Sequence, residues 1–154
     1  MIEINVYHRK WYSVIKKPKI FVKNIINTCL IDLNIYKYKP TISIVLANNT
    51  LLQELNYKYR NKQKPTNVLS FTYNKLDKNC YLGEIFISLD VIIQESADLD
   101  IPIEHHASHM LIHGLLHILD YKHEEPLEQY IMESIEIKLL DKLGIRNPYV
   151  SRET

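Results

Sequence analysis

The chain has 154 residues and a mass of 18.3 kDa, a length that predicts a single domain over residues 1–154. Hydrophobic residues make up 46% and charged residues 24%, ordinary globular values that exclude a disordered, collagen-like or disulfide-rich chain. No apolar run reaches eighteen residues and the N-terminus has no signal-peptide pattern, so we expect a cytoplasmic protein without a membrane partner. Cys29 and Cys80 lie far apart and are expected to be reduced thiols.

The net charge of +1 conceals an uneven distribution along the chain. Residues 1–80 carry 14 Lys and Arg against 4 Asp and Glu, whereas residues 81–154 carry 5 against 14. This division has two interpretations. Either the basic part meets a polyanionic partner, or the two parts mix on the folded surface and their fields cancel.

The first half of the chain alternates between strand and helix patterns. Pro18 opens a segment with apolar residues at helical spacing, and Asn48 and Asn49 are suitable N-cap residues for a later helix. A β-branched run lies between these segments. The predicted elements are a strand at Glu3–His8, a helix at Ile20–Ile35, a strand at Thr41–Ala47 and a helix at Leu51–Tyr59.

The second half begins with two short strands and ends with three helices. Gly144 is suited to end the last helix. The predicted elements are strands at Val68–Thr72 and Glu84–Ser88, joined by a polar connection, and helices at Leu89–Ala97, from Pro102 to about Leu119, and at Leu127–Leu143. The whole order predicts a single α+β domain with a small central mixed β-sheet and about five helices.

Six of the seven histidines fall between residues 105 and 123. His113 and His117 are four residues apart, which places both imidazoles on one face of a helix. His123 follows six residues later, and the same spacing holds zinc in metzincins. Three imidazoles with an open fourth position are typical of catalytic zinc. We therefore expect one Zn²⁺ per chain, bound by a helix and the loop after it.

The alternative is that His113 and His117 are hydrogen-bonded core residues and His123 is a surface residue. His105 and His109 continue the row of His113 and His117. They are either alternative ligands or, as we expect, residues that support the ligands or lie on the helix surface. His106 lies off this row and is predicted to be exposed.

Two positions depart from the zinc-protease pattern. Gly114 stands where such a protease has its general-base glutamate, which disfavours peptide hydrolysis. Gly114 either leaves open space beside the metal or allows close packing of the helix. Asp120 replaces a turn glycine, and the turn can survive because Asp tolerates the left-handed conformation better than most residues.

A basic and aromatic segment precedes the first of the two short strands. It contains four cations and two tyrosines: Tyr57, Lys58, Tyr59, Arg60, Lys62 and Lys64. Positive charge can contact phosphates and aromatic rings can stack on bases, so the pattern is compatible with single-stranded nucleic acid. A solvated basic loop is the alternative.

Taken together, these stretches resemble the YbeY family of rRNA maturation endoribonucleases. The family pattern joins Leu-Asn-x-x-Tyr-Arg, Thr-Asp/Asn-Val-Leu-Ser-Phe, Gly-Asp-Ile-x-Ile-Ser and His-Gly-x-Leu-His-Leu-x-Gly-Tyr-Asp-His. The matching stretches are Leu55–Arg60, Thr66–Phe71, Gly83–Ser88 and His113–His123, and the resemblance covers most of residues 50–148. This chain departs from the pattern with Asp120 for a glycine and Lys122 for an aspartate.

The resemblance implies a zinc-dependent endoribonuclease that cleaves single-stranded RNA in 16S rRNA maturation and ribosome quality control. The implied partners are rRNA and a ribosomal subunit or assembly proteins. Arg60 would clamp the scissile phosphate or neutralise charge in the transition state, and Ser70 and Glu84 would shape the cleft. The alternatives are a non-catalytic ribosome-assembly protein with a structural zinc and, less favoured, a metalloprotease.

Overall fold

Four strands form one mixed sheet in the computed structural model, which describes residues 1–61 and 66–150. Their order across the sheet is β1-β2-β4-β3. β1 and β4 both pair in parallel with β2, and β3 pairs antiparallel with β4. The strands are β1 (Ile2–Val6), β2 (Thr41–Ala47), β3 (Val68–Thr72) and β4 (Tyr81–Ser88). The fold is therefore the predicted α+β class with a mixed sheet.

Six α-helices and one 3₁₀-helix accompany the sheet within residues 1–61 and 66–150. They are α1 (Trp11–Val14), α2 (Pro18–Asp32), the 3₁₀-helix η1 (Tyr36–Tyr38), α3 (Asn49–Arg60), α4 (Leu89–Leu99), α5 (Ile103–Ile118) and α6 (Pro126–Lys142). Five of the six α-helices correspond to the predicted ones. The sixth, α1, has only four residues, too few for a periodic pattern.

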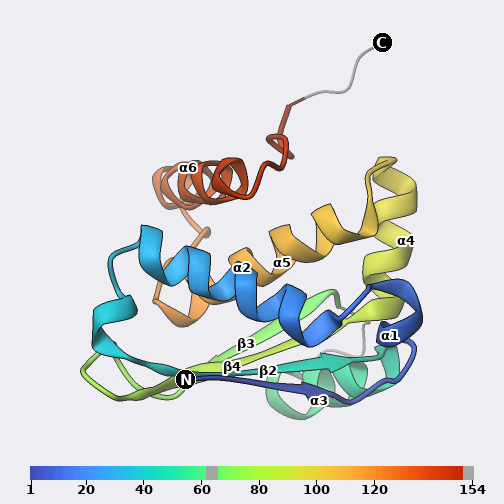
Figure 1. The fold of residues 1–154 in the computed structure, drawn as a ribbon, viewed down its shortest axis with the longest axis horizontal. Coiled ribbons are helices and arrows are strands. Elements are labelled where there is room, and N and C mark those ends of the chain that lie inside the picture. The colour runs from blue at the N-terminus through green and yellow to red at the C-terminus, as the bar shows by residue number, and fades with distance from the viewer. Residues whose placement is uncertain (62–65, 151–154) are drawn as a thin grey trace.

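The helices lie in layers on the two faces of the sheet (Figure 1). α2 and α5 pack on one face, α6 lies outside them, and α3 covers part of the opposite face. The main core between the sheet and α5 contains Ile44, Ile85 and Leu115, all buried. This arrangement places the C-terminal part of α5 between β3 and α6.

Some predicted boundaries differ from the observed ones. β4 begins at Tyr81, so the expected polar connection is partly strand, and β1 ends at Val6 instead of His8. The extension of β4 is explained by pairing, because Tyr81 and Gly83 align with Thr41 and Ile42 of β2. Part of the predicted basic loop, residues 62–65 with Lys62 and Lys64, lies outside the described residues.

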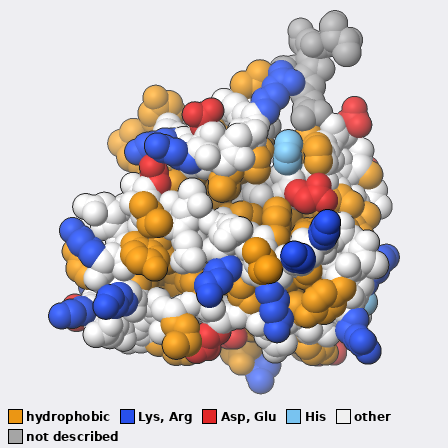
Figure 2. All heavy atoms as spheres, in the orientation of Figure 1, with side chains coloured by type: hydrophobic (Ala, Val, Ile, Leu, Met, Phe, Trp, Pro, Cys, Tyr) orange, Lys and Arg blue, Asp and Glu red, His pale blue; other side chains and the backbone are white. Residues whose placement is uncertain are grey.

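Positive charge is dispersed over the face of the molecule that Figure 2 shows. Lys and Arg side chains lie scattered there among apolar side chains. On this face the Lys and Arg side chains do not gather into a single patch. Cys29 and Cys80 are free thiols, as expected. None of the helices in the described residues combines the length and hydropathy needed to cross a bilayer.

Candidate metal centre

Helix α5 positions two of the three predicted ligands. Its apolar residues are buried on several sides, because the helix contacts β3, β4, α2, α4 and α6. His113 and His117 are only half-buried and lie one helical turn apart on the side that remains accessible. The surrounding packing therefore holds both imidazoles at the edge of the core.

The turn after α5 brings the third histidine back to the first two. Asp120 adopts a left-handed conformation with φ of 73°. The Asp120 amide donates to the His117 carbonyl at 3.0 Å, and the Tyr121 amide donates to the Leu116 carbonyl at 3.0 Å. This is the Schellman pattern of helix termination, usually built on glycine. The turn therefore forms with Asp120 in place of glycine, as expected. His123 follows the turn and is exposed.

The three imidazoles face one another. One nitrogen from each of His113, His117 and His123 lies within 4.8 Å of the others, and within residues 1–61 and 66–150 this is the one cluster of three or more potential metal ligands. The Nε2 atoms of His113 and His117 are 3.0 Å apart. The structure therefore brings together all three residues that the spacing singled out.

Hydrogen bonds fix the orientation of two of these rings. His113 Nδ1 lies 2.6 Å from Oε2 of Glu136, and His117 Nδ1 lies 3.1 Å from the Tyr121 carbonyl oxygen. Since a carboxylate and a carbonyl oxygen are acceptors, each Nδ1 carries a hydrogen and donates the hydrogen bond. Each Nε2 then keeps a lone pair directed at the centre of the cluster.

Glu136 joins α6 to this cluster and is completely buried. Besides His113, its carboxylate contacts Nε2 of His109 at 3.0 Å and accepts a hydrogen bond from the Tyr149 hydroxyl. Burial by itself would raise the pKa of Glu136, but the hydrogen bonds from His109, His113 and Tyr149 together outweigh it and lower the pKa to about 2. Glu136 is therefore an anion at neutral pH.

The pKa of His117 is lowered to about 4, first because burial penalises the charged imidazolium and then because His113 and His123 lie close by. His117 is therefore neutral at physiological pH. A neutral imidazole is the form that binds metal ions.

The cluster suits a transition-metal ion such as zinc. The Nε2 atoms of His113 and His117 are 3.0 Å apart, and their facing lone pairs repel each other unless a proton or a cation lies between them. Ligands about 2.05 Å from zinc at tetrahedral angles would be roughly 3.3 Å apart, close to this separation. The buried carboxylate behind His113 supplies the partner that metal-bound histidines usually have. His113, His117 and His123 are the residues that would hold the ion.

A cavity of about 590 Å³ opens beside the three histidines. Arg60 lines it from the C-terminal end of α3, and its Nη2 donates to the Ser70 carbonyl at 3.4 Å. Ser70 also lines the cavity and its hydroxyl donates to the Gly114 carbonyl at 3.1 Å. Glu84 is not among the lining residues and instead accepts a hydrogen bond from Tyr73. The cavity thus joins Arg60 and Ser70, but not Glu84, to the three histidines.

Gly114 allows close packing and does not leave open space beside the cluster. A Cβ atom at this position would lie 3.0 Å from Ile85 Cγ2, 3.0 Å from Ser70 Oγ and 3.2 Å from Val68 Cγ2. The open-space interpretation is therefore wrong. α5 approaches the sheet here more closely than a larger residue would allow.

The other three histidines of α5 each lie in a different environment. His109 contacts Glu136, which in turn contacts the ligand His113, so His109 has the expected supporting role. His105 is half-exposed on the helix surface. The prediction that His106 is exposed is wrong, because His106 is only 5% exposed and its Nε2 lies 2.8 Å from Oε1 of Glu95 on α4. The packing of α4 on α5 covers it.

Sequence reasoning missed Glu136 and Tyr149. A weak signal existed for Glu136, which lies at helical spacing among the buried residues Met132, Leu139 and Leu140 of α6. An acid on the apolar face of a helix requires a buried partner. Tyr149 lies beyond the last helix and has no comparable signal in the sequence.

The fold and the site define a small α+β protein with a candidate three-histidine metal centre beside a cleft. A sequence model of the endoribonuclease YbeY family matches residues 5–144. The chain is 85% identical to an endoribonuclease YbeY of Ehrlichia canis and 54% identical to one of Anaplasma marginale, in each case over all of both chains. It therefore belongs to the endoribonuclease YbeY family.

The fold is also similar to that of a protein from Thermotoga maritima whose structure was solved in solution. The TM-score is 0.61 at 19% sequence identity, covering 99% of this chain and 97% of the other. At this identity the similarity concerns the fold alone. It agrees with the mixed sheet and helix layers described above.

Proposed function

We propose that this chain is a zinc-dependent endoribonuclease that cleaves single-stranded RNA in 16S rRNA maturation and ribosome quality control in the cytoplasm. Its family is one of endoribonucleases, hydrolases that act on RNA. The observation that carries the proposal for the site is the convergence of His113, His117 and His123 in a cavity that Arg60 also lines.

The shape of the site favours a catalytic over a structural metal. Structural zinc sites usually have four protein ligands, whereas three ligands are typical of a catalytic site. Within the described residues the cluster has three members and faces a cavity of about 590 Å³. When bound, zinc acts as a Lewis acid toward a phosphoryl oxygen and activates water at neutral pH.

The residues of the chain itself then have distinct tasks. His113 and His117 are oriented by the hydrogen bonds of their Nδ1 atoms to Glu136 and to the Tyr121 carbonyl, so that each Nε2 faces the centre of the cluster. Arg60 is exposed and its guanidinium can grip two phosphate oxygens, orienting the scissile phosphate and offsetting the charge that develops on it. Tyr57, Tyr59 and Lys58 of the same helix lie exposed and can bind the flanking strand.

The proposal is tested with end-labelled single-stranded RNA and its double-stranded counterpart. We expect the zinc-loaded protein to cleave the single strand internally, and EDTA or His117→Ala to abolish cleavage. RNA that is bound but not cleaved would favour the non-catalytic assembly protein with a structural zinc. Digestion of casein would favour the metalloprotease, which Gly114 in place of a base glutamate argues against. The ribosomal role is tested by adding immature small subunits and mapping cleavage of their 16S rRNA precursor.

A further inference from the structure

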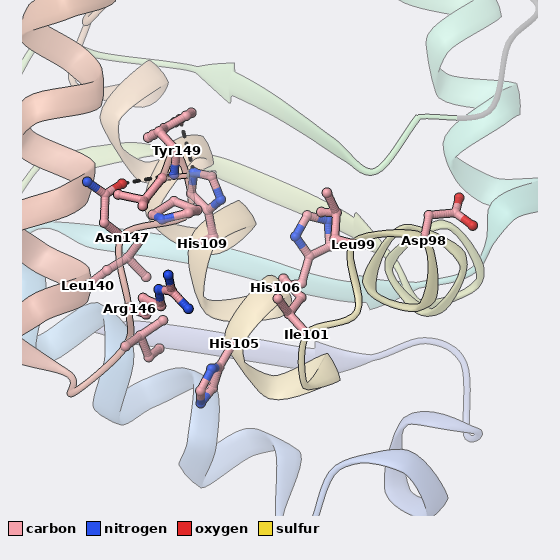
Figure 3. Close-up of a pocket in the computed structure, with 13 residues that line it drawn as sticks. Asp98, Leu99, Ile101, His105, His106, His109, Leu140, Arg146, Asn147 and Tyr149 are labelled. Carbon is pink, nitrogen blue, oxygen red and sulfur yellow. Dashed lines mark hydrogen bonds between the residues drawn. The ribbon is translucent and has the colours of Figure 1, made fainter. Parts of the chain in front are cut away.

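A second cavity lies along the N-terminal half of α5 (Figure 3). Its volume is about 480 Å³, within the usual range of small-molecule sites. The connection from α4 to α5 and residues 145–150, which follow α6, form its other walls. It shares no lining residue with the cavity beside the three histidines.

Apolar groups make up most of the surface of the wall, although seven polar residues, Asp98 and His105 among them, also line it. His109 and Tyr149 form one end, with ring centroids 5.4 Å apart in an edge-to-face arrangement. Mostly apolar walls with convergent polar groups are typical of small-molecule sites. The apolar lining residues are Leu99, Ile101, Leu140, Ile145, Pro148 and Val150.

His106 contributes a buried polar atom without a partner. The ring lines the cavity, and Figure 3 shows it between Leu99 and His109. Its Nε2 lies 2.8 Å from Glu95 Oε1, and in the tautomer that donates there Nδ1 is an acceptor. Nδ1 is buried and has no hydrogen-bond partner among the residues that the structure describes. Such an atom costs free energy until a donor reaches it.

Arg146 supplies a cation at the same cavity. The residue is exposed, lines the cavity and forms no ion pair within residues 1–61 and 66–150. A guanidinium can bind a phosphate group with two parallel hydrogen bonds. Among the described residues the cavity therefore combines an apolar wall, an arginine that forms no ion pair, and a buried acceptor in the wall that has no donor.

We propose that this cavity binds a nucleotide, with the base between the apolar walls, a base N–H donating to His106 Nδ1 and the phosphate on Arg146. The choice of a nucleotide rests on the proposed function, which brings RNA to the neighbouring cleft. Nδ1 is shielded from solvent, so side chains of the wall shift when the donor enters, as is common on binding. The same chemistry is offered by a free mononucleotide and by one nucleotide of an RNA strand.

The test follows backbone amide resonances of the zinc-loaded protein during titration with the four nucleoside 5′-monophosphates and, separately, with a nuclease-resistant 2′-O-methyl hexanucleotide. Arg146→Gln removes the cation, and Arg9→Gln, at an exposed arginine outside the cavity, is its control. Leu99→Trp fills the cavity, and Leu127→Trp is its control. Both leucines are more than half exposed, at 52% and 69%, so both variants are expected to fold.

We expect shifts at Ile101, Arg146 and Asn147, a loss of about tenfold in affinity with Arg146→Gln, and no binding with Leu99→Trp, while both controls bind as the wild type does. Shifts with a mononucleotide identify a free ligand, and shifts with the hexanucleotide alone identify the strand. The inference is overturned if neither ligand shifts these resonances or if both cavity variants bind normally. Cleavage of RNA without nucleotide binding would overturn this inference alone, and binding without cleavage would overturn the proposed function alone.

Discussion

Nδ1 of His113 lies 2.6 Å from Oε2 of Glu136, a carboxylate that has no exposed surface. The contact joins a predicted metal ligand on α5 to the middle of α6. Because Glu136 also contacts His109 and Tyr149, the same anion fixes three side chains, two from α5 and one from the segment after α6. The orientation of His113 therefore depends on the packing of α6 and of the segment after it.

Replacing Glu136 with Gln is expected to weaken zinc binding by about 10–100-fold, because the amide no longer provides an anionic acceptor for His113 Nδ1. Affinity is measured by competition with a chromophoric chelator. Glu133→Gln, on the same helix, is the control, since Glu133 accepts from Gln129 and not from a histidine. Equal zinc affinity of wild type and Glu136→Gln would show that the carboxylate does not support the ligand.

The stability of the metal-free protein is expected to fall as the pH drops from 6.5 to 4. Burial and the neighbouring His113 and His123 lower the pKa of His117 to about 4, from an ordinary value of 6.5. In this interval the unfolded chain takes up a proton that the folded chain excludes, which favours unfolding. The loss attributable to His117 should be on the order of 1–3 kcal/mol.

Urea unfolding of wild type and His117→Gln at pH 7, 6, 5 and 4 checks this. The wild type should lose more free energy of unfolding than the variant does over the same interval. An NMR titration of the His117 ring in the folded protein provides the direct control. A ring that titrates near 6.5 there would contradict the expected dependence.

The part of the site that depends on local spacing along the chain could be predicted from the sequence. His113 and His117 face the same way because four residues make about one helical turn. His123 reaches them because the chain reverses at Asp120, which a short turn allows. The strands and the longer helices could also be predicted, because hydrophobic periodicity is likewise a local property of the sequence.

What the sequence could not show depends on contacts between distant elements. Which acid of α6 faces His113 depends on how α6 packs against α5, and four acids lie within the helix, of which only Glu136 is buried. His106 was expected to be exposed because the helical row excludes it, yet α4 covers it through Glu95. The close approach at Gly114 likewise depends on Ile85 and Ser70, far away in the chain.

Zinc content is expected to be one ion per chain in the wild type and to fall strongly in the Ala variants of His113, His117 and His123. The reason is that three ligands share one ion, so the loss of any one opens the site. Metal content is measured by mass spectrometry after dialysis. His105→Ala is the control, since His105 lies on another part of α5. Full occupancy in His123→Ala with loss in His109→Ala would mean that the ligand set is wrongly assigned.

Lys122→Asp is expected to tighten zinc binding. Lys122 is exposed and directly precedes His123, at a position where the family pattern has an aspartate. An anion there can accept a hydrogen bond from the imidazole N–H and attract the metal cation, whereas a lysine repels the cation. Competition with a chelator should show a gain within about 10–100-fold. Lys122→Ala separates removal of the lysine from addition of the acid. Unchanged or weaker binding in Lys122→Asp would mean that this position does not support His123.

Arg60 and its neighbouring lysine are expected to differ in what they contribute to RNA cleavage. Arg60 lines the cavity beside the histidines, whereas Lys58 is exposed on the same helix with its Nζ 5.3 Å from the centre of the Tyr59 ring. A guanidinium can grip two phosphate oxygens at once, but an ammonium group is a point charge. Loss of Lys58 should therefore weaken binding modestly and lower the salt dependence by about one phosphate contact.

Arg60→Lys keeps the charge and removes the planar fork, so it separates geometry from electrostatics. Under saturating RNA we expect its cleavage rate to fall by roughly 10²-fold, as for loss of a single donor to transition-state charge. Lys58→Ala should cleave at the wild-type rate once RNA is saturating. Single-turnover kinetics on a labelled single-stranded RNA compares the two variants. If Arg60→Lys cleaves as fast as the wild type under these conditions, Arg60 only helps to bind the strand, because its geometry then makes no difference to the step that breaks the phosphodiester bond.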